Sequence, residues 1–259
     1  MNIAALMYHD VVAPGRDDDS GFPGAAAAHY KLETGEFFRH LGELANSGLR
    51  FVPVNAAPWP DTRCCLLTFD DGGVSALSVG VELSARQMTG HFLITTARIG
   101  TPGFVSADDV RALRAEGHVI GSHSHTHPAE ISRLDTAALD REWRESVDRL
   151  QQILGEPITV ASIPGGFYSR SVVQAAARAG IRHLFTSEPT IRTHRVDGCL
   201  VLGRYTLWRD MPSANALSLA LGTDALRQRQ WLTWNLKKPL KRGARPLYRL
   251  VRRRWLGEV

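Results

Sequence analysis

Residues 121–128 read GSHSHTHP, so imidazoles occur at the alternate positions 123, 125 and 127. On a helical turn or in a compact loop His123 and His127 would converge on one point, whereas on an extended strand all three rings would face one way. Either arrangement supplies two neutral imidazoles, which are common zinc ligands. A polar loop that happens to be rich in histidine is the alternative interpretation.

Two adjacent carboxylates, Asp70 and Asp71, follow the apolar run CCLLTF at 64–69. Like charges this close raise the pKa of one carboxyl group. A divalent cation would relieve the repulsion, binding one acid and leaving the other free to take a proton. Two histidines, one carboxylate and an open position form a familiar catalytic zinc set. Such a zinc lowers the pKa of its water to about 7.

Each stretch alone has a plain alternative, since DDG is often only a turn. Together they favour a metal site, because both follow strands and they lie some fifty residues apart. Strand and helix signals alternate along most of the chain, which predicts parallel strands with outer helices in a barrel or a doubly wound sheet. Strands are expected at 3–8, 64–69, 91–95, 119–121, 158–161, 181–186 and 199–202, and helices at 34–47, 74–88, 106–117, 136–154, 171–179 and 213–220.

Composition limits the class of protein. Apolar residues make up 44% of the 259 residues, enough for a large core, and no apolar run reaches the roughly 18 residues of a membrane span. The first residues read as a strand and lack the pattern of a secretory signal. The three cysteines, two of them adjacent at 64 and 65, form no disulfide framework. These features favour a cytoplasmic protein.

The basic charge is concentrated at the end of the chain. Residues 231–259 carry nine Lys or Arg and one acid, a net +8, so residues 1–230 carry −3 of the total +5. Aromatic and aliphatic residues alternate with these cations, and Pro239, Gly243 and Pro246 interrupt a simple packed helix. We therefore expect a barrel over 1–230 and an amphipathic tail that lies on an anionic membrane surface. A basic helix packed on the barrel is the alternative, and no recognition motif indicates a nucleic-acid partner.

The motifs TFDDG at 68–72 and HSxxHP at 123–128 resemble the polysaccharide deacetylase family, also called NodB-homology or carbohydrate esterase 4, over about residues 1–210. The resemblance implies an α/β fold, a distorted (β/α) barrel with fewer than eight β/α units, and removal of acetyl groups from sugars. It also implies that Asp70 is the general base and that Asp71, His123 and His127 bind Zn²⁺, or another divalent metal such as Co²⁺ or Ni²⁺. His125 falls where the family often has an aromatic residue, which implies that it lines the site.

The family's third motif, Arg-x-Pro-x-Gly, is only partly matched by SIPGGFY at 162–168. The family uses that arginine to orient the base, but here the position is Ser162, and Arg204 is a candidate substitute. A backbone N–H near Gly165 could help to hold an oxyanion. We assign Gly165, Tyr168 and His125 to oxyanion and substrate binding, although a plain Pro-Gly-Gly turn is the alternative.

The family's last motif supplies a histidine acid from Leu-x-His, and no clean match follows residue 190. Members with a rearranged motif order carry a Tyr-His after the first strand, as Tyr8 and His9 do here. A closed barrel brings its first and last strands together, so His9 is our candidate general acid. An ordinary histidine at a strand end is the alternative.

These observations predict a metal-dependent N-deacetylase of acetylated amino sugars, nucleotide- or lipid-linked, that acts in the assembly of cell-surface polysaccharide such as O-antigen, capsule or exopolysaccharide. The predicted location is cytoplasmic, with peripheral contact to the membrane. One alternative is an amidohydrolase-type metallohydrolase that uses His123 and His125 as ligands. Another is a glycan-binding barrel that holds metal without turnover.

Overall fold

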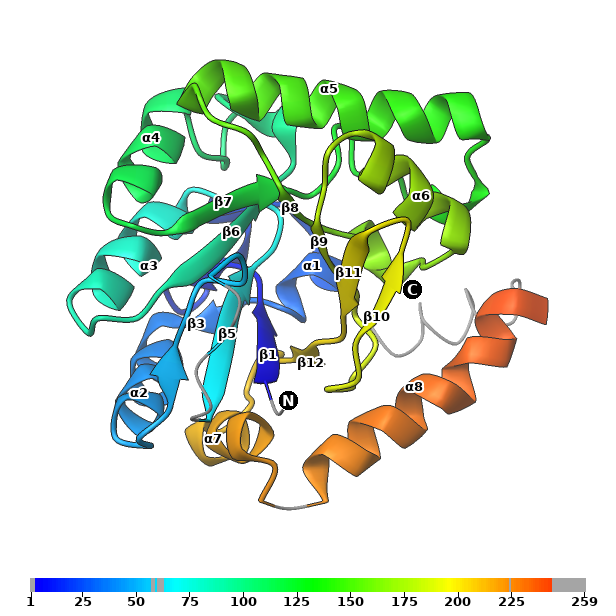
Figure 1. Cartoon of the computed structure of the whole chain (residues 1–259). Helices are drawn as coiled ribbons and strands as arrows, with labels where there is room; N and C mark the ends of the chain where they lie inside the picture. Colours follow the sequence, from blue (N-terminus) through cyan, green and yellow to red (C-terminus); the bar gives the residue numbers. More distant parts are fainter. Residues whose placement is uncertain (1–2, 57–58, 60–62, 224, 244–259) are drawn as a thin grey trace.

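The computed structural model describes the chain except for residues 1–2, 57–58, 60–62, 224 and 244–259. Its centre is a curled sheet with helices around the outside (Figure 1). The strands of this sheet are β1 (Ile3–Tyr8), β4 (Arg50–Phe51), β5 (Cys64–Phe69), β6 (Gly90–Ile94), β7 (Val119–Ser122), β8 (Val160–Ser162), β9 (His183–Phe185), β10 (His194–Val196), β11 (Cys199–Leu202) and β12 (Tyr205–Thr206).

The strand order is β10-β11-β9-β8-β7-β6-β5-β1-β12, with β4 paired to β5 off this path. Neighbours are parallel except for β10 and β11, which form an antiparallel pair. Within the described residues, β12 and β10 end the path without pairing to each other, so the barrel is open between them. The predicted fold, a distorted barrel with fewer than eight β/α units, is confirmed.

Helices and short strands fill the connections. The predicted helices are confirmed, with ends that shift by a few residues, as α2 (Thr34–Ala45), α3 (Ser75–Ser84), α4 (Ala107–Ala115), α5 (Thr136–Leu154), α6 (Arg170–Arg178) and α7 (Ser213–Leu221). Two further helices, α1 (Ala25–Ala28) and α8 (Leu226–Gly243), lie outside the predicted helical ranges. Strand β2 (Val11–Val12) pairs with β3 (Leu32–Glu33) in a separate small sheet.

Local sequence explains where these helices begin and end. Ser106 and Asp109 form a capping box at the start of α4, which satisfies two backbone donors that the helix leaves unpaired. Asp135 accepts from the Ala138 N–H at the start of α5. Gly155, at φ 69°, ends α5 in the left-handed conformation that glycine adopts without steric cost.

Strand β5 is buried along its whole length, as its uninterrupted apolar run predicted. Alternate residues serve two cores, because successive side chains on a strand point to opposite faces. Cys65, Leu67 and Phe69 pack under the helices, whereas Cys64 and Leu66 pack inside the barrel. Thr68 and Asp70 have the parity of the inner face, so β5 ends by sending a carboxylate towards the barrel interior.

Helix α8 covers the exposed edge of β12. Gln230 accepts from the Thr206 N–H at 3.2 Å and donates to the Thr206 carbonyl at 2.9 Å, which replaces the missing strand neighbour. The helix begins at Leu226 and passes through Pro239, so the predicted boundary at 231 falls inside a helix and the first part of the tail is packed on the barrel. No described helix is both long and apolar enough to cross a bilayer; residues 244–259 lie outside the description.

Candidate metal and catalytic site

Asp71, His123 and His127 come together at the carboxyl ends of β5 and β7. One possible ligand atom from each lies within 4.8 Å of the other two. His123 Nε2 is 3.4 Å and His127 Nε2 3.6 Å from Asp71 Oδ1. His125 is not part of this group of described residues.

The local backbone brings these side chains together at some conformational cost. Asp71, Ser124 and His127 all have positive φ, at 78°, 64° and 58°. They are three of the six described non-glycine residues in this conformation, which concentrates unfavourable backbone geometry at one place, as functional sites often do. Of the two arrangements that the spacing allowed, the compact loop is the one adopted. Ser124 Oγ accepts from the His127 N–H at 3.1 Å and closes this loop.

The donors fit a divalent metal. Burial raises the pKa of Asp71 well above its usual range, and the negative charges of Asp10 and Asp70 add to this effect. Burial lowers the pKa of His123 to about 3 and also lowers that of His127. Both imidazoles are therefore neutral and able to donate a lone pair, and a cation would compensate the buried carboxylate.

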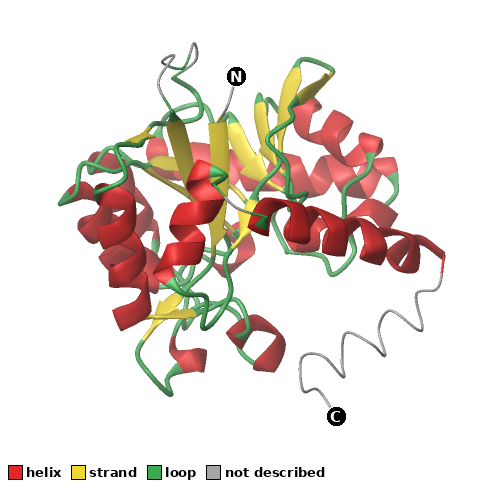
Figure 2. Cartoon of the chain, turned by 90° about the horizontal axis from the view of Figure 1, so that it is seen from below, coloured by secondary structure: helices red, strands yellow, loops and turns green. Residues whose placement is uncertain are grey.

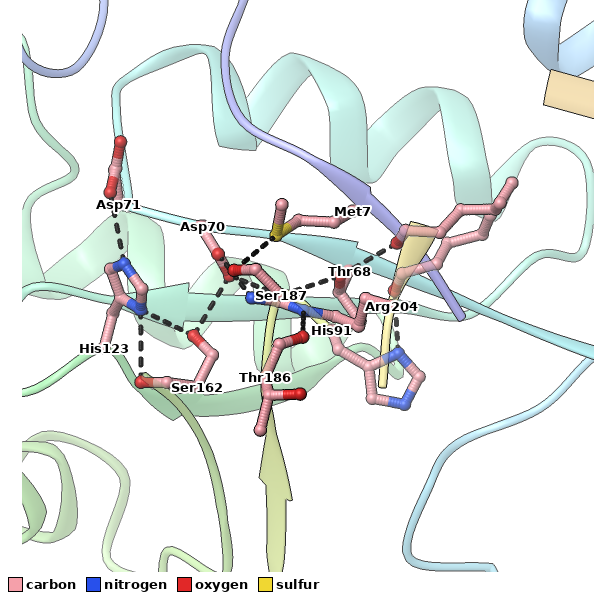
Figure 3. A network of polar contacts seen from close by, with 12 residues as sticks. Met7, Thr68, Asp70, Asp71, His91, His123, Ser162, Thr186, Ser187 and Arg204 are labelled. Atoms are coloured by element: carbon pink, nitrogen blue, oxygen red, sulfur yellow. Dashed lines mark hydrogen bonds and ion pairs between the residues drawn. The ribbon is translucent and has the colours of Figure 1, made fainter. Parts of the chain in front are cut away.

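Ser162, which occupies the position of the motif-three arginine, links the two halves of the site. Its hydroxyl donates to Asp70 Oδ1 at 3.0 Å and lies 2.5 Å from His123 Nδ1. Because a carboxylate can only accept, the serine proton is committed to Asp70, so His123 Nδ1–H donates to the serine oxygen. This tautomer leaves His123 Nε2 with its lone pair towards Asp71 (Figure 3).

Arg204 forms a two-pronged ion pair with Asp70 (Figure 3). Nη1 donates to Oδ1 and Nη2 to Oδ2, both at 2.7 Å. Nη1 also donates to Thr68 Oγ1 and Nε to the Thr186 carbonyl, each at 3.0 Å. Arg204 is fully buried, so these bonds offset the cost of taking a guanidinium out of water.

The surroundings keep Asp70 ionised. Burial alone would raise its pKa, but the positive charge and hydrogen bonds of Arg204, with a contribution from His123, hold it far below the usual range. Asp70 and Asp71 are adjacent in sequence, yet their pKa values move in opposite directions. The two acids therefore have the distinct electrostatic settings that a base and a metal ligand would need.

His9 lies close enough to Asp70 and His127 for their charges to affect its pKa. Its ring centroid is 5.0 Å from that of Tyr30, and its Nδ1 is buried without a hydrogen-bond partner among the described residues. Burial lowers its pKa to about 4, and Asp70 only partly opposes this. The resting imidazole is therefore neutral, which differs from the imidazolium expected of a general acid.

The other predicted substrate-binding residues occupy different places. Gly165 has φ 59°, and a Cβ added there would lie 3.9 Å from the carbonyl of Ala129, in the loop that carries His127. Tyr168 is exposed at the rim, where its hydroxyl lies 3.2 Å from Nε2 of His194. Gly165 therefore flanks the metal-ligand loop, whereas Tyr168 contacts none of the candidate ligands.

The position of His125 departs from the expectation that it lines the site. Its Nδ1 lies 3.0 Å from Thr96 Oγ1, and its Nε2 lies 3.6 Å from Glu145 on α5. The compact loop turns this ring towards the outer helix, because Glu142 of α5 accepts from the His125 and Thr126 N–H groups. The structure thus separates His125 from the three converging donors.

Sequence reasoning missed residues that pack around the site. The ring of Phe22 lies 4.8 Å from that of His127, centroid to centroid. The buried Lys31 donates to the carbonyls of Asp17, Ser20 and Phe22 at 2.6 to 2.7 Å, and so holds the loop that carries Phe22. No motif marks these residues, although an isolated Lys in an apolar setting is a weak signal of burial.

Comparison with known proteins agrees with this geometry. Residues 59–184 match the family model for polysaccharide deacetylase. The match spans 126 of the 259 residues, and it confirms the resemblance to this family that the motifs predicted.

Curated relatives include the putative polysaccharide deacetylase YxkH of Bacillus subtilis (strain 168), 21% identical over 192 residues, which are 71% of this chain and 64% of that protein. A chitooligosaccharide deacetylase of Rhizobium leguminosarum bv. trifolii is 25% identical over 124 residues, 47% of this chain and 55% of that one. An uncharacterised 30.6 kDa protein of Geobacillus stearothermophilus is 26% identical over 132 residues, 49% of this chain. The chain spans 48% to 64% of the length of these relatives.

Solved structures share the fold. The Streptococcus pyogenes deacetylase PplD, solved in complex with acetate, superposes with a TM-score of 0.71 at 18% identity, covering 85% of this chain and 98% of that one. IcaB from Ammonifex degensii gives 0.68 at 20% identity, covering 85% and 97%. At this level of identity the likeness establishes the fold alone.

Proposed function

We propose that this protein is a metal-dependent N-deacetylase of acetylated amino sugars that acts in the assembly of cell-surface polysaccharide. The observation that carries the proposal is the convergence of Asp71, His123 and His127 beside an ionised Asp70. The match to the family model supports hydrolysis of an acetyl group.

A divalent metal held by Asp71, His123 and His127, which we take to be Zn²⁺, would supply Lewis acidity for a water molecule and the acetyl carbonyl. Asp70 takes the proton of the attacking water, while Arg204 and Ser162 keep its carboxylate in one orientation. A backbone N–H near Gly165 contributes to holding the oxyanion.

His9 delivers a proton to the departing sugar nitrogen. Because its pKa is lowered to about 4, His9 is neutral at neutral pH and gains that proton only during the reaction. Its buried Nδ1 has no partner among the described residues, so one ring nitrogen is available for this transfer. Its proximity to Asp70 gives the proton a short route from base to acid.

The proposed substrates are nucleotide-linked or lipid-linked sugars, and the proposed location is the cytoplasm, at the inner face of the membrane. The basic segment 231–259 supports the membrane contact through its net +8 charge. Lipid-linked intermediates would meet the enzyme at that surface.

Specific observations also support one alternative function, a glycan-binding protein. The family arginine is absent at Ser162, and the resting His9 is neutral, which would suit a glycan-binding protein that holds metal without turnover. The amidohydrolase alternative is less favoured, because His125 lies outside the ligand group of the described residues.

The test measures acetate release from a panel of N-acetylated nucleotide-linked and lipid-linked sugars, with and without added Zn²⁺. We expect metal-dependent release that is lost in Asp70→Asn. The matched control is Asp140→Asn, an acid on the outer helix α5 that pairs with Arg178. Absence of acetate from every sugar, with stoichiometric metal bound, would reject the enzyme in favour of the binding protein.

A further inference from the structure

Helix α8 has an inner face that is held firmly against the barrel. Arg227 donates to the Leu219 and Ala220 carbonyls at 2.7 and 2.9 Å, and its guanidinium lies 5.0 Å from the ring centroid of Tyr205. Gln230, one turn further, binds both backbone groups of Thr206. These contacts set the rotation of α8 about its own axis, so its opposite face must point outwards.

That outer face carries large apolar side chains in water, because Leu232 is 53% and Leu236 72% exposed. Arg229, one turn before Leu232, is exposed beside them. Leucine recurs at 232, 236 and 240 in the sequence, a four-residue spacing that follows one side of a helix. Figures 1 and 2 show α8 along the outside of the barrel.

The charge of the neighbouring sequence selects the partner. Lys237, Lys238, Lys241 and Arg242 follow directly in α8, and residues 231–259 as a whole contain a single acid. An exposed apolar face on so basic a segment matches the boundary between acyl chains and anionic head groups. A second copy of the same face would instead bring like charges together.

We propose that the outer face of α8, formed by Leu232 and Leu236 with Arg229 beside them, docks the barrel on an anionic lipid surface in a fixed orientation. The docking element is thus a helix bound to the barrel, and the attachment is rigid. The packing of α8 relates this docking to the candidate site. A Cβ added at Gly166 would lie 3.1 Å from Cη2 of Trp234 in α8. Helix α8 therefore contacts the turn that carries Gly165, so docking brings the candidate site next to the bilayer. The docking deepens the membrane contact of the proposed function, and the position of the site beside the bilayer rests on that function.

The test is co-sedimentation of the full chain with phosphatidylglycerol-containing vesicles and with pure phosphatidylcholine vesicles. We expect binding to the anionic vesicles that weakens as salt rises. Leu232→Asn with Leu236→Asn should weaken it by at least about tenfold, since one buried leucine already contributes that much. The double variant keeps every cation, so its loss reports the apolar face.

Phe38→Asn with Val81→Asn is the matched control, because these side chains are 40% and 50% exposed on other helices. It should bind like the wild type. If the double variant of α8 unfolds, Leu236→Asn alone takes its place, at the more exposed of the two positions. Equal binding by the α8 variant and the wild type, or no binding by the wild type, would overturn the proposal. So would sedimentation of the wild type as a dimer that the α8 variant dissociates.

Vesicle binding requires no turnover, so it separates failure of the docking from failure of the deacetylase. Acetate release from a soluble acetylated sugar should be the same in the α8 variant and the wild type. If the α8 variant lost both vesicle binding and acetate release, α8 would act on the folding of the site, and the proposal would be overturned.

Discussion

Arg204 and Asp70 are 134 residues apart in sequence, yet they meet through two parallel hydrogen bonds of 2.7 Å inside the barrel. Arg204 lies in the connection between β11 and β12, and it makes the contact to the base that the family's motif-three arginine would make. The planar fork of a guanidinium matches the two oxygens of a carboxylate, so the pair fixes both the charge and the rotation of Asp70.

Removing one partner of this pair should be costly. Arg204→Met leaves a buried carboxylate uncompensated, which should lower the free energy of unfolding by about 3–5 kcal/mol. Adding Asp70→Asn should recover part of that loss, because the neutral amide needs no counter-charge. Urea denaturation of the four proteins of this cycle measures the coupling; additive losses would mean that the ion pair contributes nothing beyond packing.

Arg204→Lys tests orientation separately from charge. The ammonium keeps the positive charge but cannot form two parallel bonds. We expect kcat to fall by about tenfold to a hundredfold with KM little changed, since Arg204 acts on the base and touches no substrate. A rise in KM alone would place Arg204 in substrate binding.

Substitutions of the two adjacent acids should have different effects on metal binding. Asp71→Asn should release the metal, because it removes one of three donors that lie within 4.8 Å of each other. Asp70→Asn should abolish turnover with metal still bound at one equivalent. Metal analysis after gel filtration compares them, and loss of metal from Asp70→Asn would exchange the two assignments.

Ser162 should tune metal affinity from outside the ligand set. Ser162→Ala removes the nearer acceptor of His123 Nδ1, at 2.5 Å, and leaves the Ser162 carbonyl at 3.3 Å. Loss of such an orienting partner commonly weakens metal binding by 10- to 100-fold. Competition with a chromogenic chelator measures the affinity. Ser78→Ala, an exposed serine on α3, is the control, and equal affinity in both variants would show that Ser162 leaves the imidazole free.

His125→Ala distinguishes the two metallohydrolase hypotheses. The ring lies against Thr96 and Glu145, so its loss should leave metal stoichiometry at one and reduce acetate release only slightly. If the metal dissociates instead, the ligand set would include His125, as the amidohydrolase alternative requires.

The burial of His91 predicts that the protein loses stability in mild acid. It is buried with Val54 N–H donating to Nε2 at 2.8 Å and Nδ1 2.7 Å from the Leu67 carbonyl. Burial lowers its pKa from 6.5 to about 4. Between these values the unfolded chain binds the proton more readily, so stability falls as the pH drops from 6.5 to about 4, by up to roughly 3 kcal/mol.

Melting curves across that pH range test this contribution. His91→Gln, which offers one acceptor and one donor, should show a shallower pH dependence than the wild type. His194→Gln removes an exposed histidine and serves as the control. An unchanged slope in His91→Gln would assign the acid sensitivity to other groups.

Much of the framework could be predicted from the sequence. The run CCLLTF predicted β5, and the observed strand begins and ends at the predicted residues, because a largely apolar run followed by DDG has few other interpretations. The period of 136–154 and its terminal glycine located α5 just as well. The short strands were missed: β10 and β12 have three and two residues, too few for any pattern, and exist only because neighbours supply their hydrogen bonds.

The candidate site divides in the same way. The sequence by itself determined the donors and their spacing, since Asp70, Asp71, His123 and His127 lie in motifs whose residue types suit metal and proton chemistry. Only the tertiary structure decided which ring turns inwards, because Glu142 binds the loop backbone and directs His125 outwards. It also decided that Arg204 replaces the missing arginine and that α8 is held to β12. These contacts join residues distant in sequence through burial and barrel closure, which no local pattern records.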